Sequence, residues 1–176
     1  SLNSKINSLI GNFFIGLEYI FKQSGPMTMG ASQVCGFVKS DPSRATPNLQ
    51  FHVQPISTDI LGATKMHDFD GITPTIANVR PTSRGEINIA SGDSRDNPKI
   101  KMNYLSTQDD RDVAAKALKI VRNIMMNTET FKKYDPEEYR PGIHITDDAE
   151  LVKAASDHAQ TIFHPVGTCK MGKGDE

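Results

Sequence analysis

The sequence predicts an α+β fold, in which helices cover a mostly antiparallel mixed sheet. Short runs with strand-like composition, separated by turn-rich segments, occupy the middle of the chain. Segments with helical spacing lie at its start and towards its end. The regular alternation of strand and helix that a parallel sheet requires is missing from the sequence. At 176 residues, the chain is long enough to form one domain with its own core.

The first part of the chain is expected to hold one helix and two strands. From Ile6 to Lys22, apolar residues recur at steps of three and four, which is typical of a helix with one wide apolar face. Ser24-Gly25-Pro26 ends this helix. Strands are predicted from Gln33 to Lys39 and from Leu49 to Pro55. The segment from Ser57 to Gly71 has no clear period and is expected to be a long loop, a class of segment that is often functional.

A hairpin is expected next. Thr73 to Arg80 and Glu86 to Ala90 flank Pro81-Thr82-Ser83-Arg84-Gly85, and this segment holds residues that favour a reversing turn. A short strand is predicted from Lys99 to Met102.

Two more helices are expected in the last part of the chain. Ser106 with Asp109 resembles a capping box at the start of the first, and Thr146 is expected to cap the second. The buried stripe of the first helix is predicted to be Val113, Ala117, Ile120, Val121 and Ile124. The inner face of the second is predicted to be Leu151, Val152, Ala155, Ala159, Ile162 and Phe163.

The charge balance excludes partners that are recruited by a strong electrostatic field. Twenty basic and 21 acidic residues give a formal net charge of −1, so neither nucleic acid nor an anionic membrane is expected to be attracted over a broad surface. The expected partner is a small molecule or another protein. Two cysteines are too few for a disulfide framework, which favours a cytoplasmic location. Oligomeric state and peripheral membrane association leave no readable signal.

The densest group of unusual residues runs from Thr161 to Gly172, directly after the last predicted helix. Pro165 fixes its own φ and biases His164 away from helical angles, while Gly167 permits a close approach or a left-handed turn. Such a loop could aim the His164 imidazole, and histidine suits proton transfer near neutral pH. The alternative is a structural histidine at a helix exit, and the residues alone leave both interpretations open.

The run His164-Pro165-Val166-Gly167-Thr168-Cys169-Lys170-Met171-Gly172 resembles the HPxGTxxMG signature of glucose-methanol-choline (GMC) oxidoreductases. The resemblance covers nearly the whole chain. Further segments that support it, in the family's order, are Gly25-Pro26-Met27-Thr28, Gly36-Phe37-Val38-Lys39-Ser40, Leu49-Gln50-Phe51-His52, Pro81-Thr82-Ser83-Arg84-Gly85, Asn97-Pro98 and Asn103-Tyr104-Leu105.

The resemblance implies the substrate-binding part of an FAD-dependent enzyme that moves a hydride from an alcohol carbon to flavin N5. The implied division is a leading helix at residues 1–24, the substrate-binding domain at 25–164, and at 165–176 the start of a return to a flavin domain outside this chain. His164 is then expected to be the base on the substrate hydroxyl. The expected substrate is choline or another small alcohol.

Two further residues are expected on the substrate side. His52 occupies the place where choline-oxidising members of the family have a histidine; its strand face either lines a pocket or meets solvent. Phe163 is expected either to form an apolar wall beside the substrate or to pack at the helix end. Cys169 is either a reactive thiol beside the site or a small buried apolar residue.

Some parts of an FAD enzyme are absent from this sequence. It has no G-x-G-x-x-G after a strand, and the family's second catalytic residue would fall beyond Glu176. The chain by itself is therefore expected to bind FAD poorly and to turn over little. The five histidines lack metal-ligand spacing, so no metal site is expected. The alternative function is a non-catalytic ligand-binding or interaction domain.

Overall fold

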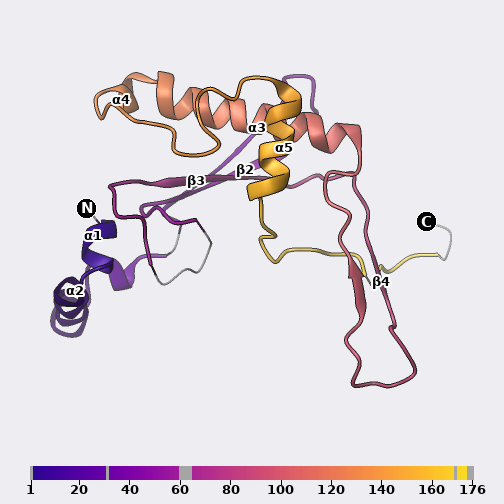
Figure 1. Cartoon of the computed structure of the whole chain (residues 1–176), viewed down its shortest axis with the longest axis horizontal. Coiled ribbons are helices and arrows are strands. Elements are labelled where there is room, and N and C mark those ends of the chain that lie inside the picture. The colour runs from indigo at the N-terminus through magenta and orange to yellow at the C-terminus, as the bar shows by residue number, and fades with distance from the viewer. Residues whose placement is uncertain (1, 31, 60–64, 169, 174–176) are drawn as a thin grey trace. The chain divides into compact units, whose positions relative to one another are not determined.

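The chain divides into two compact units, residues 1–79 and 80–176. The computed structural model describes residues 2–30, 32–59, 65–168 and 170–173. Each unit combines helices with an antiparallel sheet, so the predicted α+β class is confirmed (Figure 1). The predicted boundaries at 24/25 and 164/165 stay predictions.

The first unit is built around a three-stranded antiparallel sheet in the order β1-β2-β3. Its strands are β1 (Val34–Val38), β2 (Leu49–Gln54) and β3 (Thr73–Asn78). Leu49 and Phe51 of the middle strand are buried, so this strand contributes to the core of the unit. The predicted strands at Gln33 to Lys39 and Leu49 to Pro55 are confirmed within a residue or two.

Two helices precede this sheet in place of the single helix predicted from Ile6 to Lys22. They are α1 (Leu2–Ile6) and α2 (Leu9–Lys22), and a short 3-10 turn, η1 (Pro26–Thr28), follows. The single helix is wrong because Ser8 takes an extended conformation and its hydroxyl accepts the N–H of Gly11 at 3.2 Å, which starts a new helix.

The predicted hairpin between Thr73 to Arg80 and Glu86 to Ala90 is also wrong. Strand β3 pairs with β2, Thr73 lying opposite Gln54, whereas β4 (Glu86–Asn88) pairs with β5 (Lys99–Lys101) in the second unit. In the segment between β3 and β4, the backbone N–H groups of Thr82 and Ser83 are donated to the side chain of Asp110 in a later helix, which does not favour a tight hairpin turn there.

The second unit has its core between two helices. These are α3 (Gln108–Asn127) and α5 (Asp148–His158), with the single-turn α4 (Glu129–Lys132) after α3. Val113 of α3 is 1% exposed and Leu151 of α5 is fully buried. The buried apolar residues of the two helices are Val113, Ala115, Ala117, Leu151 and Ala154.

Both of these helices begin one residue later than predicted, and the second ends earlier. Thr107 caps α3 and Asp147 caps α5, in place of Ser106 and Thr146. The Asp147 carboxylate accepts two backbone N–H groups, which a hydroxyl does less well beside the positive end of a helix. Because α5 ends at His158, three residues of its predicted inner face lie outside the helix: Ala159, Ile162 and Phe163.

Asp110 ties the start of α3 to the segment before β4. Its side chain is buried, and its two carboxylate oxygens accept the backbone N–H groups of Thr82 and Ser83, each at 2.9 Å. Ser83 in turn accepts the Ser106 N–H through its hydroxyl at 3.0 Å. Burial acts to raise the pKa of Asp110, but hydrogen bonds from Ser83 and Thr82 outweigh it and hold that pKa below its usual value.

An ion pair ties α3 to the segment between α4 and α5. Arg122 contacts both carboxylate oxygens of Glu138, at 2.7 and 2.9 Å, and donates to the carbonyl of Ile145 at 2.8 Å. Both side chains are largely buried, at 13% and 12% exposed. The hydrogen bond to Glu138 raises the pKa of Arg122. This paired arrangement leaves neither charge uncompensated.

The first test is Asp110→Asn. Because the pKa of Asp110 is lowered in the fold, its stabilisation is complete above the pKa of the unfolded carboxyl and is lost as pH falls through the folded value. We expect the variant to lose about 2 kcal/mol of unfolding free energy at pH 7 and to show a flatter decline in acid. Urea unfolding from pH 7 to pH 3 measures both. The exposed Asp112→Asn is the control, and an equal loss in the two variants would contradict the assignment.

Candidate functional site

His52 lies at the centre of the first sheet. In β2 it stands opposite Cys35 of β1 and Thr75 of β3, and it is half-buried. Alternation along the strand puts His52 on the face that also carries Gln50 and Gln54, opposite the face of Leu49 and Phe51. Gln54 is buried and Gln50 is half-buried, so this polar face is partly covered.

His164 lies in the irregular segment that follows α5, and it is exposed. The residue before it, Phe163, has φ of +59°, a left-handed conformation that costs energy for a side-chain-bearing residue. The Phe163 N–H is donated to the Thr161 hydroxyl at 3.1 Å. Gly167, three residues after His164, also has a positive φ, of +95°. His164 therefore lies between two residues with positive φ.

The predicted site residues fall in both units. His52 belongs to the first, whereas Phe163 and His164 are neighbours in the second. Phe163 is 78% exposed. Cys169 lies outside the described residues.

Two hollows of the described surface are lined by other residues. One of about 490 Å³ is lined by Thr58, Asp59, Lys65, Met66, His67, Asp68 and Phe69. A smaller one, of about 150 Å³, is lined by Arg84, Gly85, Glu86, Lys101 and Asn103. His164 is exposed and lines neither of these two hollows.

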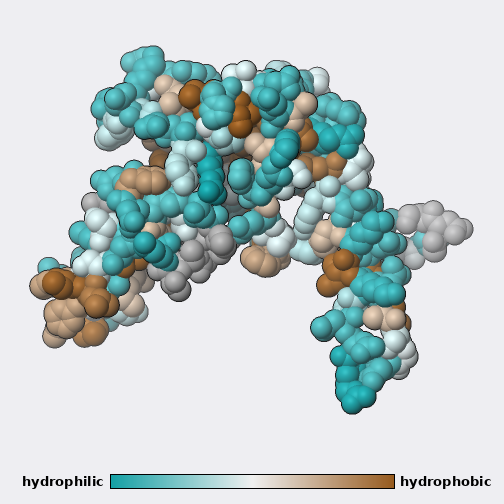
Figure 2. All heavy atoms as spheres, in the orientation of Figure 1, coloured by the Kyte–Doolittle hydropathy of each residue, from teal (hydrophilic) through white to brown (hydrophobic). Residues whose placement is uncertain are grey.

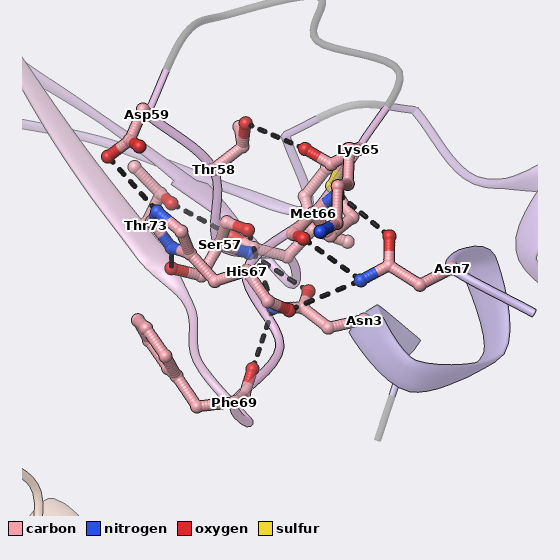
Figure 3. Close-up of polar contacts among 11 residues, drawn as sticks. Asn3, Asn7, Ser57, Thr58, Asp59, Lys65, Met66, His67, Phe69 and Thr73 are labelled. Atoms are coloured by element: carbon pink, nitrogen blue, oxygen red, sulfur yellow. Dashed lines mark hydrogen bonds and ion pairs between the residues drawn. The ribbon is translucent and has the colours of Figure 1, made fainter.

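The sequence did not point to a polar cluster of the first unit, in the segment after β2 (Figure 3). The Ser57 hydroxyl lies 2.7 Å from His67 Nδ1, and His67 Nε2 lies 3.0 Å from an Asp59 carboxylate oxygen. The His67 ring also stacks on Phe69, with centroids 4.7 Å apart. These residues fall in the predicted loop from Ser57 to Gly71, where no periodic pattern could have paired them.

Serine, histidine and aspartate in contact also occur in hydrolases, but the backbone here serves another purpose. A hydrolase uses backbone N–H groups, often that of the nucleophile itself, to hold a developing oxyanion. The Ser57 N–H is instead donated to Asn3 Oδ1 at 3.0 Å. The Ser57 carbonyl accepts the His67 N–H at 2.9 Å. The contacts of Ser57 therefore close the two ends of the loop on each other.

Asn3 of α1 and Asn7, which directly follows that helix, hold this loop in place (Figure 3). Asn3 is 2% exposed; its carboxamide nitrogen lies within 3.3 Å of the carbonyl oxygens of Ser57, His67 and Phe69. The Asn7 side chain accepts the Met66 N–H and donates to the Met66 carbonyl, both at 2.9 Å. It thus pairs with both backbone groups of Met66, as a residue of a neighbouring strand does in a sheet. These side chains satisfy backbone groups that have no sheet partner.

Within the described ranges, no three histidine, cysteine or acidic side chains are grouped so that they could hold a metal ion. None of the helices described is both long and apolar enough to cross a bilayer.

Known proteins resemble this chain over most of its length. A family model described as GMC oxidoreductase matches residues 81–176, more than half of the chain. An alcohol dehydrogenase [acceptor] of Pseudomonas putida is 40% identical over 94% of this chain and 30% of its own length. An oxygen-dependent choline dehydrogenase of Citrobacter koseri is 35% identical over 90% of this chain and 28% of its own length. The chain thus spans less than a third of these curated relatives.

Solved structures share the fold. A formate oxidase of Aspergillus oryzae RIB40, studied for the effect of a mutation on its FAD modification, superposes with a TM-score of 0.77 at 22% identity. The match covers 90% of this chain and 32% of the oxidase. At this identity the likeness concerns the fold alone.

The asparagine contacts lead to a second test, in which Asn3→Asp is compared with Asn3→Ala. The aspartate can still accept the Ser57 N–H, but its second oxygen would face three carbonyl oxygens in a buried place. We expect Asn3→Asp to be less stable than Asn3→Ala at pH 7 by about 1 kcal/mol, and to recover as pH falls. Urea unfolding at pH 7 and pH 4.5 measures this. Equal losses in both variants at both pH values would contradict the hydrogen-bond assignment.

Proposed function

Because the chain belongs to the GMC oxidoreductase family, we propose that it is the substrate-side part of an FAD-dependent oxidoreductase that acts on CH–OH donors. Curated relatives named as alcohol and choline dehydrogenases support choline or another alcohol as the donor. The observation that carries the proposal is the exposed His164, between the left-handed Phe163 and Gly167, within a segment that the family model covers.

The residues of this chain fit one side of a flavin site and not the other. An exposed imidazole on an irregular segment can approach a flat ring and a substrate hydroxyl together. The dinucleotide-binding fingerprint, by contrast, is absent from the sequence. We therefore assign the binding of the FAD dinucleotide to the remainder of a longer parent protein, and the proton-accepting group to this chain.

The role proposed for His164 is that of a general base. An alcohol carbon releases a hydride readily only as the hydroxyl proton leaves, so a proton acceptor has to lie on that oxygen. A neutral imidazole nitrogen of His164 takes the proton and holds it while the C–O bond becomes a carbonyl. Bound FAD supplies the hydride acceptor in this reaction. Phe163, beside His164, excludes water from the same place once a second surface covers it.

His52 is proposed to bind the substrate. It stands on a polar, partly covered strand face, and a histidine there can hydrogen-bond an alcohol oxygen. The anchored loop after β2 supports this assignment indirectly, since Asn3 and Asn7 fix the chain immediately beyond the strand that carries His52.

The test of the proton acceptor is His164→Ala in the full-length parent protein. We expect the rate of anaerobic flavin reduction by alcohol to fall by about two to four orders of magnitude, because the proton acceptor is lost. Stopped-flow absorbance of the flavin measures it. The control is His158→Ala, an exposed histidine at the end of α5. An unchanged rate in His164→Ala would favour the alternative of a non-catalytic binding domain.

For His52 we expect a different signature. His52→Ala in the parent protein should raise the KM for the alcohol by about tenfold and leave the limiting rate of flavin reduction within about threefold, because a binding contact is removed without loss of the base. Gln50→Ala, two residues away on the same strand face, is the matched control. A limiting rate that falls as far as in His164→Ala would place His52 in the proton transfer instead.

A further inference from the structure

Helix α2 carries an uncovered apolar surface, here called the α2 face, visible in Figure 2 as brown atoms gathered over this helix. At 100° per residue its side chains fall within an arc of about 140°. They are 62% to 90% exposed: Leu9, Ile10, Phe13, Phe14, Ile20 and Phe21. The sequence predicted that these residues share one wide apolar face of the helix. The residue of α2 that is buried is instead Ile15, which points the other way.

The orientation of α2 is fixed by its other side. Gly11 lies so close to the Lys5 carbonyl that a Cβ there would overlap it. Towards the end of the helix, a Cβ on Gly25 would lie 2.6 Å from the Glu18 carboxylate, which also accepts the Ser24 hydroxyl at 3.3 Å. Rotation of α2 about its axis would break these contacts with the segments on either side of the helix.

We propose that the α2 face is the surface on which the remainder of the parent protein docks. The six side chains expose on the order of 800 Å², about what one partner contributes to a standard protein interface. Exposed apolar patches of this size are rare on isolated soluble proteins, and phenylalanines are typical of the centre of an interface. The rings of Phe13 and Phe14 already meet edge to face, with centroids 5.7 Å apart.

A protein surface fits this face better than a lipid surface does. The charged residues of α2 are Glu18 and Lys22, so the helix has no excess of basic residues to hold it at anionic headgroups. Interfacial helices combine a strongly charged face with an apolar one, whereas the other side of α2 carries the buried Ile15 and Gly11, which lies against the Lys5 carbonyl.

The remainder of the parent also fits better than a second copy. The curated relatives are more than three times as long as the part of them that this chain matches, so most of a parent polypeptide would lie outside it. A surface tethered in the same chain has an effective concentration in the mM range, far above that of a separate copy. The identity of this remainder as the FAD-holding part rests on the proposed function.

The experiment is thiol labelling of the native parent protein with Phe14→Cys. We expect maleimide to react at least about tenfold more slowly than in the urea-unfolded parent, because docking shields the position. Lys22→Cys, on the opposite side of the same helix, is the matched control and should react at close to the unfolded rate. Peptide mass mapping separates these sites from other cysteines. Leu9→Cys, at a position 90% exposed, repeats the measurement if Phe14→Cys folds poorly.

Equal labelling of Phe14→Cys and Lys22→Cys in the native parent would overturn the proposal. Protection that disappears on dilution would assign the face to a second copy, and protection that requires phosphatidylglycerol vesicles would assign it to a membrane; both overturn the proposal. A photoreactive benzoylphenylalanine at position 14 should crosslink to the parent chain outside these 176 residues. Labelling and crosslinking do not depend on catalytic activity. Docking can therefore be confirmed even if the His164→Ala test contradicts the proposed function.

Discussion

Irregular backbone has to find hydrogen-bond partners, and one buried polar side chain in each unit meets this constraint. Asn3 satisfies four backbone groups of the loop after β2, and Asp110 satisfies two N–H groups before β4. The regular elements alone would leave these groups unpaired. Each side chain comes from a helix far away in the sequence, so the position of the loop and the position of the helix are determined together.

This constraint separates what the sequence could predict from what it could not. Strands β1 and β2 and helices α3 and α5 follow from local periodicity, because their own side chains make the pattern. The pairing of β3 with β2 does not, because a turn-rich segment such as Pro81 to Gly85 suggests a hairpin unless its N–H groups are known to bind Asp110. The end of α1 before Ser8 could not be predicted either, because apolar residues continue at helical spacing on both sides of Ser8.

The candidate site shows the same division. His164 could be singled out from Pro165, Gly167 and the signature that follows, because these residues restrict the backbone locally. The left-handed Phe163 could not, since a phenylalanine gives no sign of a positive φ. Nor could the contact of Ser57 with His67, which joins residues ten apart across a segment without a period. Membership of the GMC family rests on the region from residue 81 onward, whereas His52 lies before it.

The left-handed Phe163 has a thermodynamic consequence for the residue that follows it. Its ring is 78% exposed, so packing within the described part of this chain offsets little of the cost of its backbone conformation. A neighbouring surface that covered the ring would stabilise this rotated backbone over its relaxed alternatives. Under the proposed function, docking of such a surface and the orientation of the His164 imidazole would then be coupled in one equilibrium.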